Sequence, residues 1–205
     1  MEYIEKLVLE KQVIHLGCAD HIPLIKEKIR KNNWFHKRLV NCTRRCLGID
    51  IDQEAIEYLK NELGYKDVLK ADIIKDDPIE QISAQKWDYL IMGELLEHLD
   101  DPINFLKNIK NKYSLYINCL IVSAPNALRI ENYHNSKKHL ELINSDHRFW
   151  FTPYTLAKIM NQADFQVDSF QFCQGYKMGA GLILKRRLLK KYPAFRDTIV
   201  MTAKF

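Results

Sequence analysis

Two apolar segments, each ending in a distinctive residue, constrain the fold of this chain most. Residues 13–16 form an apolar run that ends at Gly17, and residues 46–49 form another that ends at Asp50. A helical segment lies between them. A glycine lets the backbone pass close to a ligand at the end of one strand, and a carboxylate ending the next strand can accept from both ribose hydroxyls. This order predicts an α/β fold that binds a nucleotide.

The dinucleotide-binding fingerprint is not met in this segment. Its second and third glycines would stand where the chain has Ala19 and Ile22. Its acidic residue would follow about 20 residues on, and Asp50 lies well beyond that distance. The sequence therefore disfavours a nicotinamide cofactor and favours a different adenosyl ligand.

Three later segments complete a set of motifs at the ends of predicted strands. Asp72 follows a third apolar segment, residues 93–102 read Gly-Glu-Leu-Leu-Glu-His-Leu-Asp-Asp-Pro, and Ser-Ala-Pro-Asn ends a fifth segment at Asn126. From residue 13 onward the chain resembles the class I S-adenosylmethionine-dependent methyltransferases. It is most similar to the small bacterial enzymes of the ubiquinone and glycan-modification type, which carry a Gly-Glu-x-x-Glu-His-x-x-x-Pro signature.

The alternation of strand and helix patterns predicts a parallel sheet with helices on both faces. We expect one Rossmann-like methyltransferase domain over residues 1–205, with seven mostly parallel strands. The resemblance implies that the last strand runs antiparallel beside the sixth, at one edge. The expected strands are residues 12–17, 46–50, 67–70, 88–92, 115–123, 165–172 and 198–204. The expected helices are residues 22–31, 53–63, 102–111 and 153–162.

Composition narrows the class of protein further. A chain of 205 residues with 47% apolar content suits one domain with a substantial core. Residues 1–11 are charged throughout, and no run approaches the roughly 18 apolar residues of a membrane span. The five cysteines are an odd number and lie mostly in apolar runs, which favours reduced thiols in the cytoplasm. Cys42 and Cys46 have no second ligand pair at metal spacing, so we predict no metal site.

The resemblance implies S-adenosylmethionine as cofactor and S-adenosylhomocysteine as product. Asp50 is expected to accept from the ribose hydroxyls, Ile51 to pack on the adenine, and Asp72 to accept from the adenine amino group. Asp52 is expected to cap the next helix rather than bind ligand. His15 stands where the family often has an acidic residue. The full set of expected cofactor-binding residues is His15, Gly17, Cys18, Ala19, Asp50, Ile51, Asp72, Ile73, Gly93, Glu94 and His98.

The acceptor is expected to bind under a substrate or lid segment at residues 126–152, which is long, irregular and rich in aromatic residues. His147 is the candidate general base, because histidine suits proton transfer at neutral pH and the family has a similar Asp-His-x-x-Trp/Phe segment. The alternative is a purely structural or lid histidine. Candidate substrate contacts are Asn126, Tyr133, His139 and Arg148.

A basic segment at residues 182–192 places leucines on one helical face and lysines and arginines on the rest. One interpretation is a docked helix with a solvated basic face. The other is a surface for peripheral membrane contact, or for a lipid-linked glycan carrier.

Three functions compete. The leading one is methylation of a small molecule or glycan, most simply at a hydroxyl, with N-methylation open. The second, a nucleic-acid methyltransferase, is disfavoured because the Asn/Asp-Pro-Pro-Tyr/Phe segment used in base methylation is replaced by residues 93–96, and the net charge of +5 is mild. The third is a non-catalytic binding module of the same fold. Monomer and homodimer are both compatible with the sequence.

Overall fold

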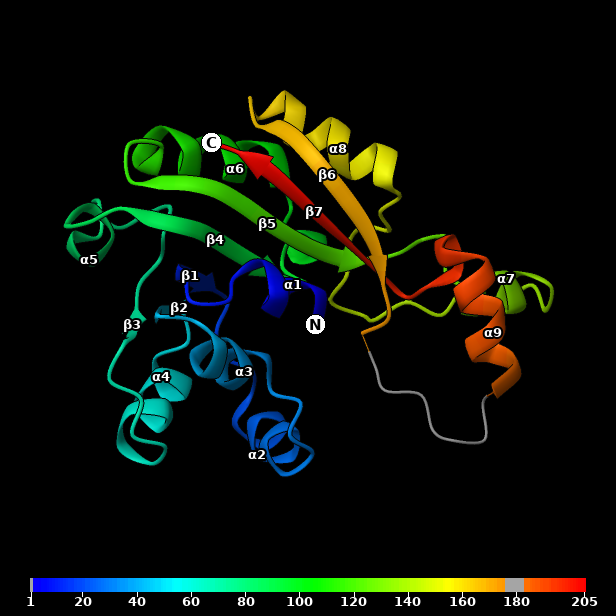
Figure 1. The fold of residues 1–205 in the computed structure, drawn as a ribbon, viewed down its shortest axis with the longest axis horizontal. Coiled ribbons are helices and arrows are strands. Elements are labelled where there is room, and N and C mark those ends of the chain that lie inside the picture. Colours follow the sequence, from blue (N-terminus) through cyan, green and yellow to red (C-terminus); the bar gives the residue numbers. More distant parts are fainter. Residues whose placement is uncertain (1, 176–182) are drawn as a thin grey trace.

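The computed structural model describes residues 2–175 and 183–205 and is built around one seven-stranded sheet (Figure 1). The strands lie in the order β3-β2-β1-β4-β5-β7-β6. Their bounds are β1 Gln12–Leu16, β2 Arg45–Asp50, β3 Val68–Lys70, β4 Trp87–Gly93, β5 Ile117–Pro125, β6 Gln166–Cys173 and β7 Thr198–Lys204. All seven expected strands are present, and the Rossmann-like fold class is confirmed.

Strand direction follows the expected mixed pattern. β1 to β5 pair in parallel, and β7 pairs antiparallel with both β5 and β6. The antiparallel last strand is therefore confirmed. However, β7 lies between β5 and β6, so the edge of the sheet is β6.

Helices cover both faces of the sheet (Figure 1). On one face, α5, α6 and α8 contribute Ile82, Leu106 and Leu156 to the largest apolar cluster. On the other, α1 and α3 pack through Ile4 and Leu39, and α2 and α4 form a third cluster. The bounds are α1 Glu2–Leu7, α2 Ile22–Arg30, α3 Phe35–Cys42, α4 Gln53–Asn61, α5 Glu80–Ser83, α6 Pro102–Tyr113, α7 Ile130–Ser136, α8 Pro153–Gln162 and α9 Ile183–Lys191, with 3₁₀ turns η1 Leu96–His98 and η2 Pro193–Phe195.

Local side-chain chemistry explains where the predicted helices begin. The Asp52 carboxylate accepts from the Ala55 N–H at 3.0 Å, which confirms it as the N-cap of α4. Asp101 caps α6 in the same way, ahead of a proline at the first helical position. α8 begins with a reciprocal Thr152–Thr155 capping box followed by Pro153.

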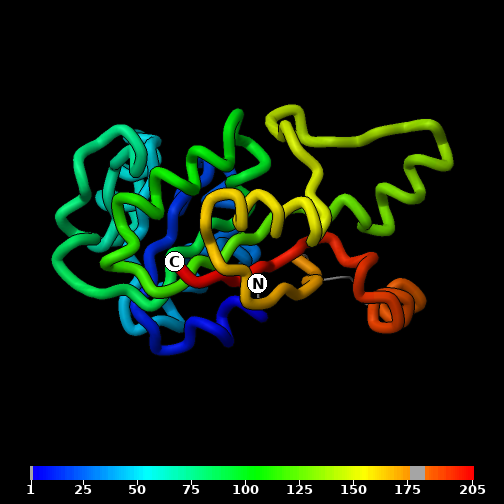
Figure 2. The backbone as a smooth tube through the Cα atoms, turned by 90° about the horizontal axis from the view of Figure 1, so that it is seen from above, coloured from blue at the N-terminus to red at the C-terminus, as the bar shows by residue number. Residues whose placement is uncertain are grey.

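The segment of residues 126–152 is more ordered than expected. It contains α7, and Asn126 pairs with Phe151 in a β-bridge that closes the two ends of the segment together. Figure 2 shows α7 and the chain after it reaching beyond the carboxyl-end side of the sheet. α7 and the Asn126–Phe151 bridge depend on contacts between residues far apart in the sequence, and local composition does not predict such contacts.

The basic segment forms α9, whose buried Leu189 docks it on the body of the protein. A Lys185–Glu131 ion pair ties α9 to α7. Residue 182, the first of the predicted basic segment, lies outside the described residues. Within residues 2–175 and 183–205, no helix combines the length and apolar character needed to cross a bilayer.

Candidate active site

The candidate site lies where the strand order reverses, between β1 and β4. These neighbouring parallel strands place Leu16 beside Met92, so Gly17, which follows β1, and Gly93, the last residue of β4, lie at the same edge of the sheet. In open α/β sheets a ligand binds in the crevice at this reversal, beyond the carboxyl ends of the strands. The predicted cofactor motifs therefore meet at one edge.

The turn after β1 needs its glycine. Gly17 has a φ of +72°, a left-handed conformation that side chains disfavour, and its N–H donates to the Ile49 carbonyl at 2.9 Å. Cys18 is buried, so it can offer a ligand only its backbone. The turn is thereby fixed against the end of β2.

Asp50 joins this turn to the one after β2. One carboxylate oxygen accepts from the Ala19 N–H at 2.9 Å and the other from the Asp52 N–H at 3.1 Å. Burial raises the pKa of Asp50, and these hydrogen bonds oppose that rise. A carboxylate oxygen can accept more than one hydrogen bond, so Asp50 keeps capacity for a ligand. Ile51 beside it is 69% exposed, an apolar side chain open to a planar partner. We call residues 17–19 and 50–52 the cofactor turns.

The turn after β3 is occupied by its own hydrogen bonds. Asp72 Oδ1 accepts from the N–H groups of Ile74 at 3.0 Å and Lys75 at 3.1 Å, and Oδ2 lies 3.6 Å from Lys75 Nζ. Ile73 is only 3% exposed and packs in the main core. Any contact of Ile73 with a ligand would therefore go through its backbone, because its side chain points into the core.

His15 lies in the core rather than on the cofactor surface. It is 3% exposed, its Nδ1 lies 3.1 Å from Nδ1 of His36, and Phe35 packs edge-on against its ring. Burial lowers the pKa of His15 well below its usual value, with the charge of His36 acting in the same direction. Burial also lowers the pKa of His36, to about 4. Both rings are thus neutral at physiological pH.

The turn after β4 combines close packing with backbone strain. A Cβ on Gly93 would lie 3.1 Å from Phe35 Cε1, and Glu94 has a φ of +51°, uncommon for a residue with a side chain. The side chain of Glu94 is partly accessible to solvent, but the surrounding protein removes water from its carboxyl group, and this desolvation raises its pKa. Asp197 adds to this rise, while Lys28 opposes it.

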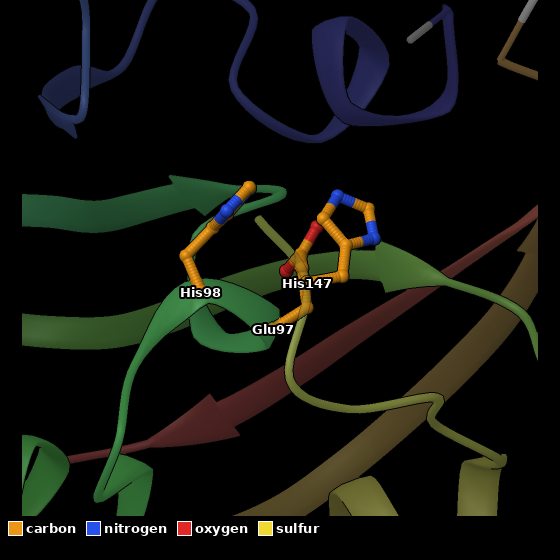
Figure 3. Close-up of side chains that lie close together, drawn as sticks. All are labelled: Glu97, His98 and His147. Carbon is orange, nitrogen blue, oxygen red and sulfur yellow. The ribbon is translucent and has the colours of Figure 1, made fainter. Parts of the chain in front are cut away.

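Just beyond this turn, Glu97, His98 and His147 come together; we call them the glutamate–histidine cluster (Figure 3). Glu97 is fully buried, and among residues 2–175 and 183–205 neither oxygen of its carboxyl group has a hydrogen-bond partner. Burial raises the pKa of Glu97 to about 8, with the charge of Glu94 contributing. Burial lowers the pKa of His147, and so does the charge of His98. The two imidazole rings pack edge to face, with centroids 4.6 Å apart.

Arg148 fastens the segment that carries His147 to η1. Its backbone N–H donates to the Glu97 carbonyl at 2.7 Å, its Nη1 donates to the His98 carbonyl at 2.7 Å, and its Nε pairs with Asp100. Contacts 48 to 51 residues apart in sequence thus fix the cluster. Arg148 was predicted to contact substrate, and the structure gives its guanidinium an anchoring role.

The other three expected acceptor contacts lie apart from one another. Asn126 is completely buried, donates to the carbonyls of Ala194 and Arg196, and accepts from the Leu128 N–H. Both amide hydrogens and the amide oxygen of this buried side chain therefore help to hold the chain in place. Tyr133 and His139 are exposed on α7 and the turn that follows it.

Sequence reasoning left two residues of this region without a role. Glu97 stands inside the quoted signature, but only the structure shows that it is buried and lacks partners. His36 carries no motif at all. Its pairing with His15 joins α3 to β1 across 21 residues, and no local pattern signals it.

Comparison with known proteins agrees with this geometry. The methyltransferase-domain family matches residues 2–169, so the chain belongs to that family. It is an S-adenosylmethionine-dependent methyltransferase of class I, and S-adenosylmethionine is its cofactor. No curated protein matches the sequence.

Similar solved structures share the fold at low identity. The small RNA methyltransferase HEN1 is 17% identical with a TM-score of 0.61; the match covers 99% of this chain and 24% of that one. A methyltransferase from Aquifex aeolicus is 15% identical with a TM-score of 0.57, over 99% and 88% of the two chains. The magnesium protoporphyrin IX methyltransferase of Synechocystis PCC 6803, solved with bound S-adenosylhomocysteine, is 12% identical with a TM-score of 0.52, over 98% and 77%. This chain thus spans about a quarter of the RNA enzyme's length.

Proposed function

We propose that this enzyme methylates a hydroxyl group of a small molecule or glycan. The observation that carries the proposal is the glutamate–histidine cluster, which lies immediately beyond the Gly93–Glu94 turn and presents buried polar atoms without partners. A hydroxyl needs help to lose its proton, whereas a neutral amine already carries a free electron pair. A buried carboxyl group and two histidines are groups that can take part in such proton transfer.

The cofactor would be held by the cofactor turns, with Asp50 on the ribose and Ile51 against the adenine. When bound, it supplies a methyl group that is already activated as part of a sulfonium. The protein's remaining tasks are to align the acceptor oxygen, exclude water and assist deprotonation. The lowered pKa of His147 keeps its imidazole neutral and able to accept a proton.

A lipid-linked acceptor, as in the glycan-modification enzymes that the sequence resembles, would also use α9. Ile183 and Leu184 at its start are 58% and 80% exposed, and Lys190 and Lys191 lie exposed at its end. Exposed apolar side chains beside basic ones suit a surface that meets anionic head groups. Sedimentation with vesicles containing anionic lipid tests this contact, because neutral vesicles should leave the protein in the supernatant.

The acceptor class can be tested with labelled cofactor and fractionated cell extract. Label should enter a fraction that resists nuclease, and acylating the amines of that fraction beforehand should leave incorporation unchanged. Loss of label after amine acylation would indicate N-methylation. Loss after nuclease treatment would indicate the nucleic-acid alternative.

A further inference from the structure

The glutamate–histidine cluster has the composition of a metal site. One ligand atom from each of Glu97, His98 and His147 lies within 4.8 Å of the others. Metal–ligand bonds of about 2.0–2.2 Å put the atoms of one coordination shell about 3–4 Å apart, so small side-chain adjustments suffice. Figure 3 shows the carboxylate of Glu97 and the two imidazoles gathered around one space.

The cluster also lacks the partners that a purely structural cluster would have. Glu97 is 0% exposed, and neither of its oxygens accepts a hydrogen bond from the part of the chain that the structure describes. Nδ1 of His147 is likewise buried and has no partner among the described residues. Buried polar groups in folded proteins are almost always satisfied, because leaving them unpaired costs stability. A bound cation would satisfy a carboxylate and the nitrogen lone pairs at once.

His98 is oriented as a ligand would be. Its Nδ1 lies 3.1 Å from the carbonyl oxygen of Asp146. That carbonyl can only accept, so Nδ1 is the nitrogen that donates, and Nε2 is the nitrogen left to bind a cation. Metal-binding histidines typically donate their other ring N–H to a carbonyl or carboxylate in this way. The same segment supplies this carbonyl and His147, so one loop both provides a ligand and orients another.

We propose that Glu97, His98 and His147 bind a divalent first-row transition-metal cation whose open coordination positions take the acceptor hydroxyl. Two imidazoles favour such a cation over Mg²⁺ or Ca²⁺, which prefer oxygen ligands. Three protein ligands leave room for an oxygen of the substrate, as catalytic metal sites require. The identity of that oxygen rests on the proposed function; the binding of the cation does not.

A cation here would change how the hydroxyl is activated. Coordination lowers the pKa of a bound hydroxyl, as it does for metal-bound water. The O–H bond breaks with its electron pair left on oxygen, and the proton leaves to solvent. The oxygen then forms a bond to the methyl carbon while the carbon–sulfur bond breaks, and its pair remains on sulfur. His147 serves as a ligand in this state, so the cation takes over the task of a general base.

The test begins with metal-depleted protein titrated with Mn²⁺, in the absence of acceptor. Loss of the free-ion electron paramagnetic resonance signal should show one bound equivalent, displaced by Zn²⁺ at lower concentration than by Mg²⁺. Glu97→Gln and His147→Ala should each weaken Mn²⁺ binding by at least about 100-fold, because even second-shell changes cost 10–100-fold. His134→Ala, an exposed histidine on α7, should bind as wild type does.

Thermal melts without metal show whether a variant has simply failed to fold. Glu97→Gln keeps the shape of the side chain and removes a buried carboxyl without partners, so its melting temperature should equal or exceed that of wild type. Wild-type protein that binds neither Mn²⁺ nor Zn²⁺, or a folded Glu97→Gln that binds as wild type does, overturns the proposal. Methyl transfer that persists in excess chelator overturns it too and leaves hydroxyl methylation standing. If the protein binds Mn²⁺ but the label enters only amines, the metal site stands and hydroxyl methylation is overturned.

Discussion

The cofactor turns and the glutamate–histidine cluster lie at the same edge of the sheet but differ in how their polar groups are satisfied. Asp50 accepts from two backbone N–H groups, and Gly17 donates to Ile49, so the cofactor turns are held together without a ligand. Glu97 and Nδ1 of His147 are buried and have no hydrogen-bond partner within the described ranges, residues 2–175 and 183–205. One half of the site is preorganised by its own backbone, and the other half is completed by what it binds.

This contrast predicts that variants in the two halves will fail in different ways. Removal of the Asp50 carboxylate from the cofactor turns should weaken cofactor binding. Changes in the cluster should leave cofactor binding intact and affect turnover.

The largest effect is expected for His147→Ala. Assistance with proton removal contributes about 10²–10⁴-fold to rate, whether it comes from a base or from a metal held by this side chain. Turnover should fall by that order, while the dissociation constant of S-adenosylhomocysteine stays within about twofold of wild type, as calorimetry can measure. Turnover within a few-fold of wild type would make the segment a lid and His147 one of its structural residues.

The next effect concerns Asp50. Charge-assisted hydrogen bonds contribute roughly 1.5–3 kcal/mol each, so Asp50→Ala should weaken cofactor binding by more than about tenfold. The matched control is Asp52→Ala, which removes the cap of α4 and should cost about 1 kcal/mol of stability with cofactor affinity nearly unchanged. If calorimetry shows that Asp52→Ala weakens cofactor binding more than Asp50→Ala does, Asp50 is not the residue that binds the ribose.

A third prediction uses the histidine pair beneath the cofactor turns. The folded protein keeps His36 neutral down to a pKa of about 4, whereas the unfolded chain protonates near pH 6.5. The unfolded state therefore binds more protons between these values, and stability is lost as pH falls from about 6.5 to 4, by up to about 1.4 kcal/mol per pH unit per histidine. The lowered pKa of His15 acts in the same direction.

Urea unfolding of wild type and His36→Gln across pH 7.5 to 4.5 measures this difference, because groups common to both proteins cancel. His36→Gln should show the shallower loss of stability. The exposed residue His134 provides the control, since His134→Ala should follow the wild-type profile. Parallel profiles for wild type and His36→Gln would mean that the pKa of His36 is not lowered in the folded state.

The sequence predicted those features that depend on neighbouring residues in the chain, and it missed those that depend on contacts between residues far apart in the sequence. Gly17, Asp50 and the cap at Asp52 follow from a strand pattern and the residue that ends it, so a local reading located them. Asn126 has the chemistry of a ligand, but carbonyls about 70 residues away occupy its amide. The pairing of His15 with His36 and the burial of Glu97 depend on helices packing across the sheet. Local patterns do not encode such contacts, so the metal-like cluster was not predicted.

The smallest effect is expected for Arg148→Ala. The side chain is exposed, and exposed ion pairs contribute about 0–1 kcal/mol, so stability should change little. The backbone N–H of residue 148 still reaches the Glu97 carbonyl, and only the link to the His98 carbonyl and to Asp100 is lost. A looser segment should raise the acceptor KM a few-fold and leave cofactor affinity unchanged.

Two further variants separate anchoring from substrate contact. If Arg148 anchors the segment, Asp100→Ala should reproduce part of the change in KM, because it removes the partner of the guanidinium without touching Arg148 itself. Arg148→Lys should restore little, since an ammonium lacks the planar fork that reaches the carbonyl and the carboxylate together. If Arg148 instead meets a charged acceptor, Lys should recover most of the affinity and Asp100→Ala should have no effect. That result would move Arg148 from the support of the cluster to the acceptor surface.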